Sequence, residues 1–296
     1  MEMEEISCNL CGAAGRTAEE VLLLAEQPAT ENRRLARCRR CGLVYVTPRK
    51  ARRYESIPWE FYEKRYLPRF HRHPRGVESQ HERLEAFLGG RPRAGQRLLE
   101  VGCGLGHFLA EAQKRGWEAA GLEPSPEAVK WARENLLVEI QPVYLEQASL
   151  PGRHYDAVAM FEVLEHVNDP VGHLRRIEAA LAPGGVLCLS TPSFASRAYR
   201  RLGASWRVIK PRGHVYYFTR ETLGRALEQA GFGLAACVTL GGEAGDEQQV
   251  VFARQGGTRA GDAWRAARVR WAIATSRLRT EGAGGFVRAV KRRLLG

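Results

Sequence analysis

Three alternate glycines, Gly102, Gly104 and Gly106, constrain the fold of this chain more than any other feature. They follow the short apolar stretch 98–101 and precede a segment with helical periodicity. A strand that enters a helix through a glycine-rich turn lets the backbone approach a nucleotide-like ligand at the end of a parallel sheet. The glycines therefore predict an α/β domain with a ligand site at the carboxyl ends of its strands.

Acidic residues around the glycines indicate which ligand binds there. Glu123 ends a second apolar stretch 21 residues after Gly102, where a carboxylate accepts hydrogen bonds from both hydroxyls of a ribose. A dinucleotide-binding turn needs its third glycine where this chain has His107, so that class is excluded. We therefore expect a nucleoside-like ligand. A glycine-rich turn in some other α/β protein is the alternative.

The spacing E-x-G-x-G-x-G, which begins at Glu100, resembles the first motif of class I S-adenosylmethionine (SAM)-dependent methyltransferases. Three later segments resemble the same family in the same order: a fourth-strand motif at 155–167, an L-x-P-G-G turn at 181–185 and an H-x-x-x-F-T segment at 214–219. The last of these is similar to the subgroup that includes ubiquinone-biosynthesis O-methyltransferases. The resemblance covers about residues 77–254 and implies a seven-stranded, Rossmann-like α/β sheet of order 3-2-1-4-5-7-6 with a reversed final strand.

The resemblance also implies which residues form the site. In the family, the acid at the position of Glu100 interacts with the ammonium group of SAM. The residues expected to bind this cofactor are Glu100, Gly102, Gly104, Gly106, Glu123, Leu145, Glu146, Phe161 and Glu162.

Two histidines are the expected catalytic residues. We expect His214, ahead of His166, to take a proton from the acceptor, and a structural role is the alternative for both. The sequence Glu162-x-x-Glu165-His166 is associated with a divalent cation in some quinone O-methyltransferases.

The amino-terminal region carries an independent signal, two C-x-x-C-G knuckles. Four thiolates in two such pairs match a structural Zn²⁺ site, and the alternatives are disulfides or unrelated thiols. The sequence shows no signal peptide, so we expect reduced thiols and a cytoplasmic location. The predicted zinc ligands are Cys8, Cys11, Cys38 and Cys41.

These signals divide the chain into four predicted parts. They are a zinc-ribbon module at 1–50, a helical linker or lid at 51–93, the methyltransferase domain at 94–255 and a basic amphipathic helical tail at 256–296. The linker is rich in aromatic and basic residues, which suit either a lid over the pocket or a packed connection.

The tail holds most of the excess positive charge. Residues 258–296 contain ten Lys or Arg and two acidic residues, while the whole chain has a formal net charge of +12. Trp264, Trp271 and Leu278 share one face of a helix, with arginines on both sides. Such a helix suits an anionic membrane surface, or less favourably a nucleic acid, and the alternative is a helix packed on the protein with a solvated basic side.

Three functions agree with these patterns. The first is methylation, with oxygen as the favoured atom, of a small-molecule or glycan-precursor acceptor, with the tail contacting a membrane or a lipid-linked substrate. The second is RNA base methylation, because one ribosomal methyltransferase family joins a zinc ribbon to this fold. Its ribbon, however, ends in a cysteine-histidine knuckle that Cys38 and Cys41 do not reproduce. The third is a non-catalytic SAM-binding interaction protein.

Overall fold

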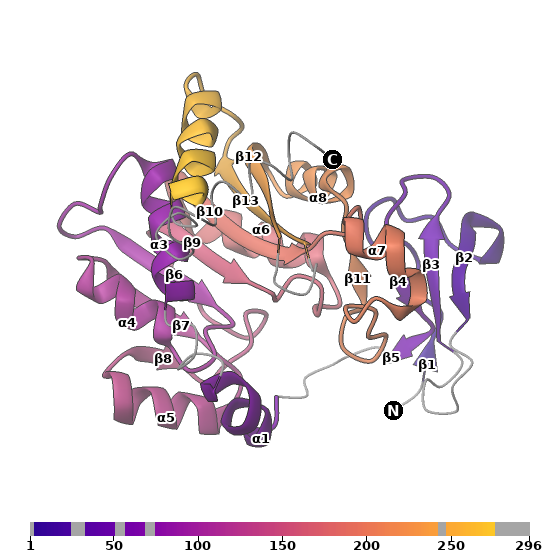
Figure 1. Ribbon diagram of the computed structural model, residues 1–296, viewed down its shortest axis with the longest axis horizontal. Coiled ribbons are helices and arrows are strands. Elements are labelled where there is room, and N and C mark those ends of the chain that lie inside the picture. The colour runs from indigo at the N-terminus through magenta and orange to yellow at the C-terminus, as the bar shows by residue number, and fades with distance from the viewer. Residues whose placement is uncertain (1–2, 25–32, 51–56, 69–74, 242–246, 276–296) are drawn as a thin grey trace, which may run out of the picture.

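The computed structural model describes residues 3–24, 33–50, 57–68, 75–241 and 247–275 (Figure 1). Its centre is a seven-stranded sheet with neighbours in the order β12-β13-β10-β9-β6-β7-β8. Counted along the sheet's own strands, this is the order 3-2-1-4-5-7-6 expected from the sequence. The bounds are β6 (Arg97–Val101), β7 (Glu118–Leu122), β8 (Glu139–Gln141), β9 (Tyr155–Phe161), β10 (Leu181–Pro192), β12 (Phe232–Gly241) and β13 (Glu247–Gln255).

The direction of the strands also agrees with the prediction. Strands β6, β7, β8, β9 and β10 run parallel, while β13 is antiparallel to both β10 and β12. Strand β10 begins within the L-x-P-G-G turn expected at 181–185, because Leu181 already pairs with Tyr155 before an irregular stretch leads to the main register at Val186. Strand β8 is short, with 3 residues.

Alternation along the strands divides the core into two layers. In β9, Ala157 and Ala159 face one layer, while Val158 and Met160 face the other. The first layer is covered by α3 (Arg75–Leu88), α4 (His107–Lys114) and α5 (Pro126–Leu136), and the second by α6 (Pro170–Ala180) and α8 (Arg220–Gln229). This period of two places the sheet between two helical layers.

Three of the helices that cover the main sheet begin at a capping side chain. The side chains of Ser125, Asp169 and Thr219 accept hydrogen bonds from the backbone of α5, α6 and α8, respectively. These caps fix where each helix leaves the carboxyl edge of the sheet.

The amino-terminal region forms two small sheets. Strands β1 (Met3–Glu4) and β5 (Arg49–Lys50) pair, and β2 (Glu19–Leu24), β3 (Arg34–Cys38) and β4 (Val44–Thr47) form a meander next to the short helix η1 (Arg16–Ala18). The meander is extended by β11 (Tyr216–Tyr217), which comes from the segment between β10 and α8. That segment also holds α7 (Arg197–Leu202) and η4 (Gly203–Ser205). The amino-terminal sheet therefore includes a strand from the predicted methyltransferase domain.

Two further helical segments flank the main sheet. The predicted linker contains α1 (Trp59–Phe61), which continues into η3 (Tyr62–Tyr66), and α3 follows them. A helix over residues 262–275 lies beside α3 (Figure 1). It packs on the core through Ala266 and Val269, while Trp264 and Trp271 are 63% and 70% exposed. The remainder of the predicted tail, including Leu278, lies outside the described residues.

None of the helices in the described part of the chain has the length and apolar character needed to cross a bilayer.

Candidate functional site

The three glycines have different structural tasks. All have positive φ angles between 53° and 73°. A Cβ at Gly102 would lie 2.5 Å from Val163 Cγ2, and one at Gly106 would lie 2.8 Å from Val138 Cγ2. These two glycines are therefore required by packing of the turn. At Gly104, the nearest atom to such a Cβ is Tyr62 Cε1 at 3.5 Å, which is an ordinary van der Waals distance. Of the three glycines, Gly104 is therefore the one whose backbone has free space beside it, next to the ring of Tyr62.

Glu123 follows β7 and faces the glycine turn. Its Oε2 accepts a hydrogen bond from the Gly104 amide at 2.9 Å, and its Oε1 accepts from the Ser125 amide at 2.9 Å and the Tyr62 hydroxyl at 3.2 Å. Burial raises the pKa of Glu123, although these donors oppose the rise. The carboxylate is thus held beside the glycine turn, and its role as a ribose acceptor stays a prediction. The contribution of Tyr62 from η3 was not singled out by the sequence analysis, although it belongs to the aromatic linker.

Glu100 supplies a second carboxyl group beside Glu123. It is fully enclosed, and burial together with the charge of Glu123 raises its pKa well above the ordinary value. Its Oε2 atom is buried and has no hydrogen-bond partner among the described residues. A buried unpaired carboxyl oxygen is costly unless a ligand supplies a donor or a positive charge. The ammonium group of SAM, directly or through water, fits this requirement.

The remaining predicted cofactor residues lie around this edge in different environments. Leu145 is buried in the core, and Glu146 Oε1 lies 3.1 Å from His173 Nε2 of α6. Phe161 packs edge-on against Phe108 at the end of β9. Glu162 has a φ of 55° and accepts a hydrogen bond from the Ser190 hydroxyl at 2.9 Å. The structure thus brings Phe161 and Glu162 to the carboxyl end of β9, while Glu146 is engaged with α6, and their roles toward a cofactor stay predictions.

The two predicted catalytic histidines meet beyond β9. Their ring centroids are 4.7 Å apart, and His166 Nε2 lies 3.9 Å from Glu165 Oε1. One ligand atom from each of Glu165, His166 and His214 lies within 4.8 Å of the others. Glu162 is not part of this group. The cluster therefore offers a carboxylate and two imidazoles to an acceptor hydroxyl or a divalent cation.

In both imidazoles, a hydrogen bond to a backbone carbonyl fixes which ring nitrogen carries the proton. His166 Nδ1 donates to the carbonyl oxygen of Gly213 at 3.0 Å, and the His214 ring bonds the carbonyl of Val208. His214 Nδ1 is buried without a hydrogen-bond partner in the described ranges, and so is Glu165 Oε1. Burial, the neighbouring His166 and the charge of Lys210 lower the pKa of His214 to about 3, so this imidazole is neutral at pH 7.

Glu165 differs from an ordinary surface carboxylate. It is fully buried, and burial raises its pKa to about 7, although a hydrogen bond from the Thr191 hydroxyl at 3.0 Å opposes the rise. It therefore changes charge near neutral pH. Its backbone carbonyl accepts hydrogen bonds from the amides of Val215 and Tyr216, which ties the cluster to β11.

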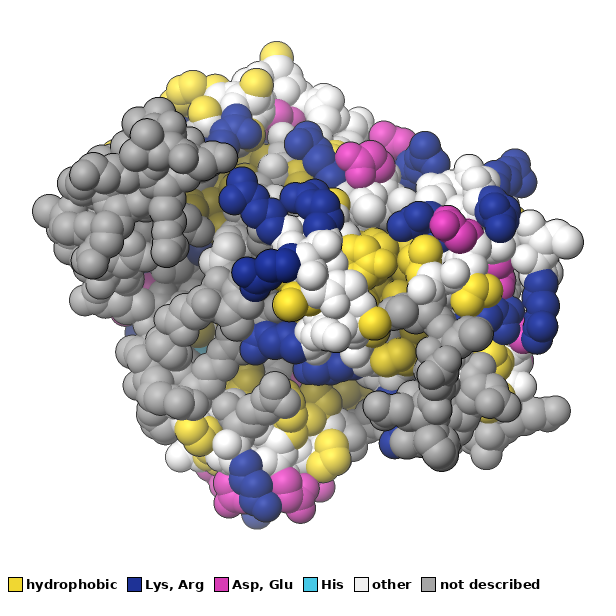
Figure 2. Space-filling model, turned by 45° about the vertical axis from the view of Figure 1, so that its right-hand side comes forward, with side chains coloured by type: hydrophobic (Ala, Val, Ile, Leu, Met, Phe, Trp, Pro, Cys, Tyr) yellow, Lys and Arg dark blue, Asp and Glu magenta, His cyan; other side chains and the backbone are white. Residues whose placement is uncertain are grey.

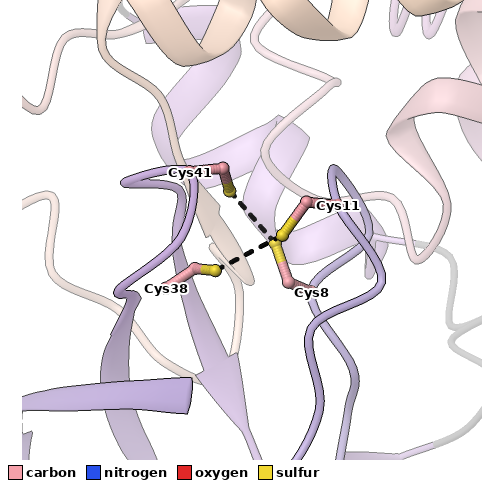
Figure 3. Close-up of side chains that lie close together, drawn as sticks. All are labelled: Cys8, Cys11, Cys38 and Cys41. Atoms are coloured by element: carbon pink, nitrogen blue, oxygen red, sulfur yellow. Dashed lines mark hydrogen bonds between the residues drawn. The ribbon is translucent and has the colours of Figure 1, made fainter.

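The four predicted zinc ligands converge from two loops (Figure 3). The Sγ atoms of Cys8 and Cys41 are 3.4 Å apart, those of Cys11 and Cys38 are 3.5 Å apart, and all four thiols are free. Tetrahedral Zn²⁺ with Zn–S bonds of about 2.3 Å needs sulfurs separated by roughly 3.8 Å, whereas a disulfide needs about 2.0 Å. The donor set and its spacing therefore fit one four-coordinate zinc ion and not a pair of disulfides.

Each knuckle is shaped by its glycine. Gly12 and Gly42 have φ angles of 69° and 80°, and their amides donate to the carbonyls of Cys8 and Cys38. The knuckles pack against α8, since Gln229 of that helix donates to the Leu10 carbonyl at 2.7 Å. Burial raises the pKa of the Cys8 thiol, so a bound metal would have to displace its proton.

Comparison with known proteins agrees with this geometry. A family model described as a methyltransferase domain matches residues 70–236, which is more than half of the chain. The chain belongs to this methyltransferase family. It is accordingly a class I SAM-dependent methyltransferase, with SAM as the cofactor that the family and fold support.

Individual relatives match this chain over part of their length. The ubiquinone biosynthesis O-methyltransferase of Methylobacterium sp. strain 4-46 is 31% identical over 159 residues, which cover 50% of this chain and 64% of that protein. The one from Chromobacterium violaceum is 34% identical over 161 residues, covering 50% and 69%, respectively. The methyltransferase thus spans just under two thirds of the first relative. A solved candidate sarcosine dimethylglycine methyltransferase from Galdieria sulphuraria shares the fold, with a TM-score of 0.52 and 13% identity over 62% of this chain and 86% of that one.

Proposed function

We propose that the methyltransferase transfers the methyl group of SAM to a hydroxyl oxygen of a small-molecule acceptor. The cluster of Glu165, His166 and His214 carries this proposal, because it places two imidazoles, that of His214 neutral, and a titrating carboxyl beyond the end of β9, the strand next to β6, which the glycine turn follows. The O-methyltransferase relatives support oxygen as the acceptor atom. SAM, when bound, supplies an electrophilic methyl group on a sulfonium.

Different residues would bind the cofactor and act on the acceptor. Glu100 and Glu123 hold the charged and hydroxyl groups of the cofactor at the edge of β6 and β7. His166, whose Nδ1 proton is committed to Gly213, presents Nε2 as the nitrogen that takes the acceptor proton. His214 Nδ1 accepts a hydrogen bond that orients the acceptor. This assignment reverses the order of the two histidines expected from the sequence.

The test is methyl transfer from labelled SAM into phenols, nucleotide sugars and RNA. With the acceptor found, His166→Ala should lower kcat by about 10²–10⁴-fold and leave affinity for S-adenosylhomocysteine nearly unchanged. His154→Ala is a matched control, because His154 lies at the opposite end of β9 and outside the cluster. A larger loss in His214→Ala would move the base to that residue. Transfer to RNA alone, or to none of the acceptors, would contradict the proposal.

We also propose that the four cysteines hold one structural Zn²⁺. A closed set of four thiolates leaves no coordination position for a substrate, so the ion would stabilise the fold and not the reaction. Reduced thiolates of this kind agree with a cytoplasmic location.

The exposed face of the 262–275 helix supports a second contact, with an anionic membrane or a lipid-linked acceptor. Trp264 and Trp271 are exposed, and the guanidinium carbon of Arg268 lies 4.8 Å from the Trp264 ring centroid. Aromatic and basic side chains together favour an anionic interface.

The membrane contact is tested by replacing both tryptophans. Trp264→Ser with Trp271→Ser should abolish sedimentation with phosphatidylglycerol vesicles, because these side chains supply the apolar contact while Ala266 and Val269 keep the helix packed. Leu137→Ser, at an 83% exposed apolar residue that follows α5, is the control. Equal sedimentation of the double variant would exclude this face.

A further inference from the structure

The segment at 179–220, which joins α6 to the start of α8, contains basic but no acidic residues. No acidic residue occurs between Glu178 and Glu221, while seven basic residues do, all with exposed side chains: Arg197, Arg200, Arg201, Arg207, Lys210, Arg212 and Arg220. Figure 2, which turns this side of the molecule forward, shows Lys and Arg side chains in a band across the face, around a hydrophobic patch. The charged residues of this segment are therefore all basic, and the segment is separate in sequence from the basic tail.

This surface is built on a fixed support. Trp206 and Val208 are buried together with Leu35 and Val44 of the amino-terminal sheet. The Lys210 amide donates to the Tyr217 hydroxyl at 3.1 Å, and one more hydrogen bond, from Arg33 to the carbonyl of Pro211, anchors the turn at 3.0 Å. A solvated charge run needs no such anchoring, whereas the turn that carries Arg207, Lys210 and Arg212 is fixed by the fold through its backbone and its buried side chains.

The end of the segment contacts the histidine cluster directly. The carbonyl of Lys210 accepts hydrogen bonds from the amides of Gly213 and His214, both at 2.8 Å, and the carbonyl of Gly213 accepts one from His166. His214 Nδ1 and Glu165 Oε1 are buried there without hydrogen-bond partners in the described parts of the chain. These unpaired atoms point to a ligand that enters beside the basic turn.

From this arrangement we propose that the acceptor is anionic and carries a phosphate or diphosphate, which Lys210 and Arg212 bind while its hydroxyl reaches the Glu165-His166-His214 cluster. The inference rests on the proposed function, and it specifies the chemical class of the acceptor. Lys and Arg bind phosphate through charge-assisted hydrogen bonds, and several cations suit a polyvalent group better than a single carboxylate. A free phosphorylated metabolite and a lipid-linked phosphate share this chemistry.

Binding of inorganic pyrophosphate, measured by calorimetry in the presence of S-adenosylhomocysteine, tests the site without the acceptor. Lys210→Gln with Arg212→Gln should weaken pyrophosphate binding by roughly 10-fold or more, the effect of losing a hydrogen bond to a charged group. The matched control, Lys114→Gln with Lys130→Gln, removes the same charge from exposed positions on α4 and α5 and should leave binding unchanged. Unchanged S-adenosylhomocysteine affinity shows that the variants fold.

Several outcomes decide the inference. No pyrophosphate binding by the wild type, or equal binding by the Lys210 and Arg212 variant, would overturn it, even if methyl transfer to an uncharged phenol upheld the proposed function. Competition between pyrophosphate and phosphatidic acid vesicles would support a lipid-linked phosphate, and pyrophosphate binding without vesicle binding would support a free metabolite. Vesicle binding that pyrophosphate does not affect, and that is lost in the Trp264→Ser and Trp271→Ser variant, belongs to the 262–275 helix, and pyrophosphate binding beside it would support a free metabolite.

Discussion

Replacement of Glu165 by glutamine should make the protein more stable at alkaline pH. Burial raises the folded-state pKa of this carboxyl to about 7 from the ordinary value of 4.5. A difference of about 2.5 pKa units corresponds to about 3 kcal/mol of unfolding free energy, since one unit is worth about 1.4 kcal/mol. The amide side chain of the Glu165→Gln variant keeps an oxygen that accepts the Thr191 hydroxyl and carries no charge to bury.

The direction of the pH dependence follows from the sign of the shift. Below pH 4.5 the carboxyl is protonated in both the folded and the unfolded state, so it carries no cost of ionisation. Between pH 4.5 and about 7 the folded state binds more protons than the unfolded state, so wild-type stability falls as pH rises. Above about pH 7 the full cost of the buried charge is present. The stability of Glu165→Gln relative to wild type should therefore increase with pH and level off above about 7.

Urea unfolding followed by tryptophan fluorescence between about pH 4.5 and 8.5 measures this difference. The buffers contain no added divalent cation and no chelator, so that a cation does not offset the charge of Glu165 and zinc is not removed. Glu134→Gln, at an exposed carboxylate on α5, controls for loss of one negative charge. A difference between wild type and Glu165→Gln that stays within about 0.5 kcal/mol across this range, or declines with pH, would refute the reasoning.

Two further predictions concern the cofactor and the metal. Glu123→Ala should weaken S-adenosylhomocysteine binding by about 1.5–3 kcal/mol, the range for a hydrogen bond to a charged group, and unchanged calorimetric affinity would place the ribose elsewhere. Protein prepared without chelator should contain about one zinc per chain by metal analysis, and Cys38→Ser should lose it; wild-type protein without zinc would contradict the structural site.

The main sheet was predictable because its signals are local or short-range. Apolar runs of strand length, glycine turns and capping residues such as Ser125 and Asp169 each act within a few residues, and the family resemblance supplied the order of the strands. The four cysteines were equally clear, since their chemistry requires a fixed spacing.

Other features depend on contacts between distant segments. Strand β11 has only two residues, and its pairing with β4 joins Tyr216 to Tyr45 across most of the chain. Nothing in its local sequence distinguishes it from a loop. The hydrogen bond from Tyr62 to Glu123 likewise depends on where η3 packs, and the buried face of the 262–275 helix is set by α3. The lack of acidic residues from 179 to 220 was visible in the sequence, and the tail's larger charge obscured it.

The pairing of β11 with β4 connects the amino-terminal sheet, which carries the cysteine knuckles, to the Glu165-His166-His214 cluster. The Val46 amide donates to the Val215 carbonyl at 3.0 Å, and the Val215 amide donates to the Glu165 carbonyl at 2.8 Å. Loss of zinc from the knuckles should therefore disturb the Glu165-His166-His214 cluster through β4 and β11. Glu123 instead takes its described protein donors from Tyr62, Gly104 and Ser125, outside the amino-terminal sheet. Cys38→Ser should consequently reduce methyl transfer and pyrophosphate binding while S-adenosylhomocysteine affinity is retained, and parallel loss of all three would mean that the knuckles support the whole fold.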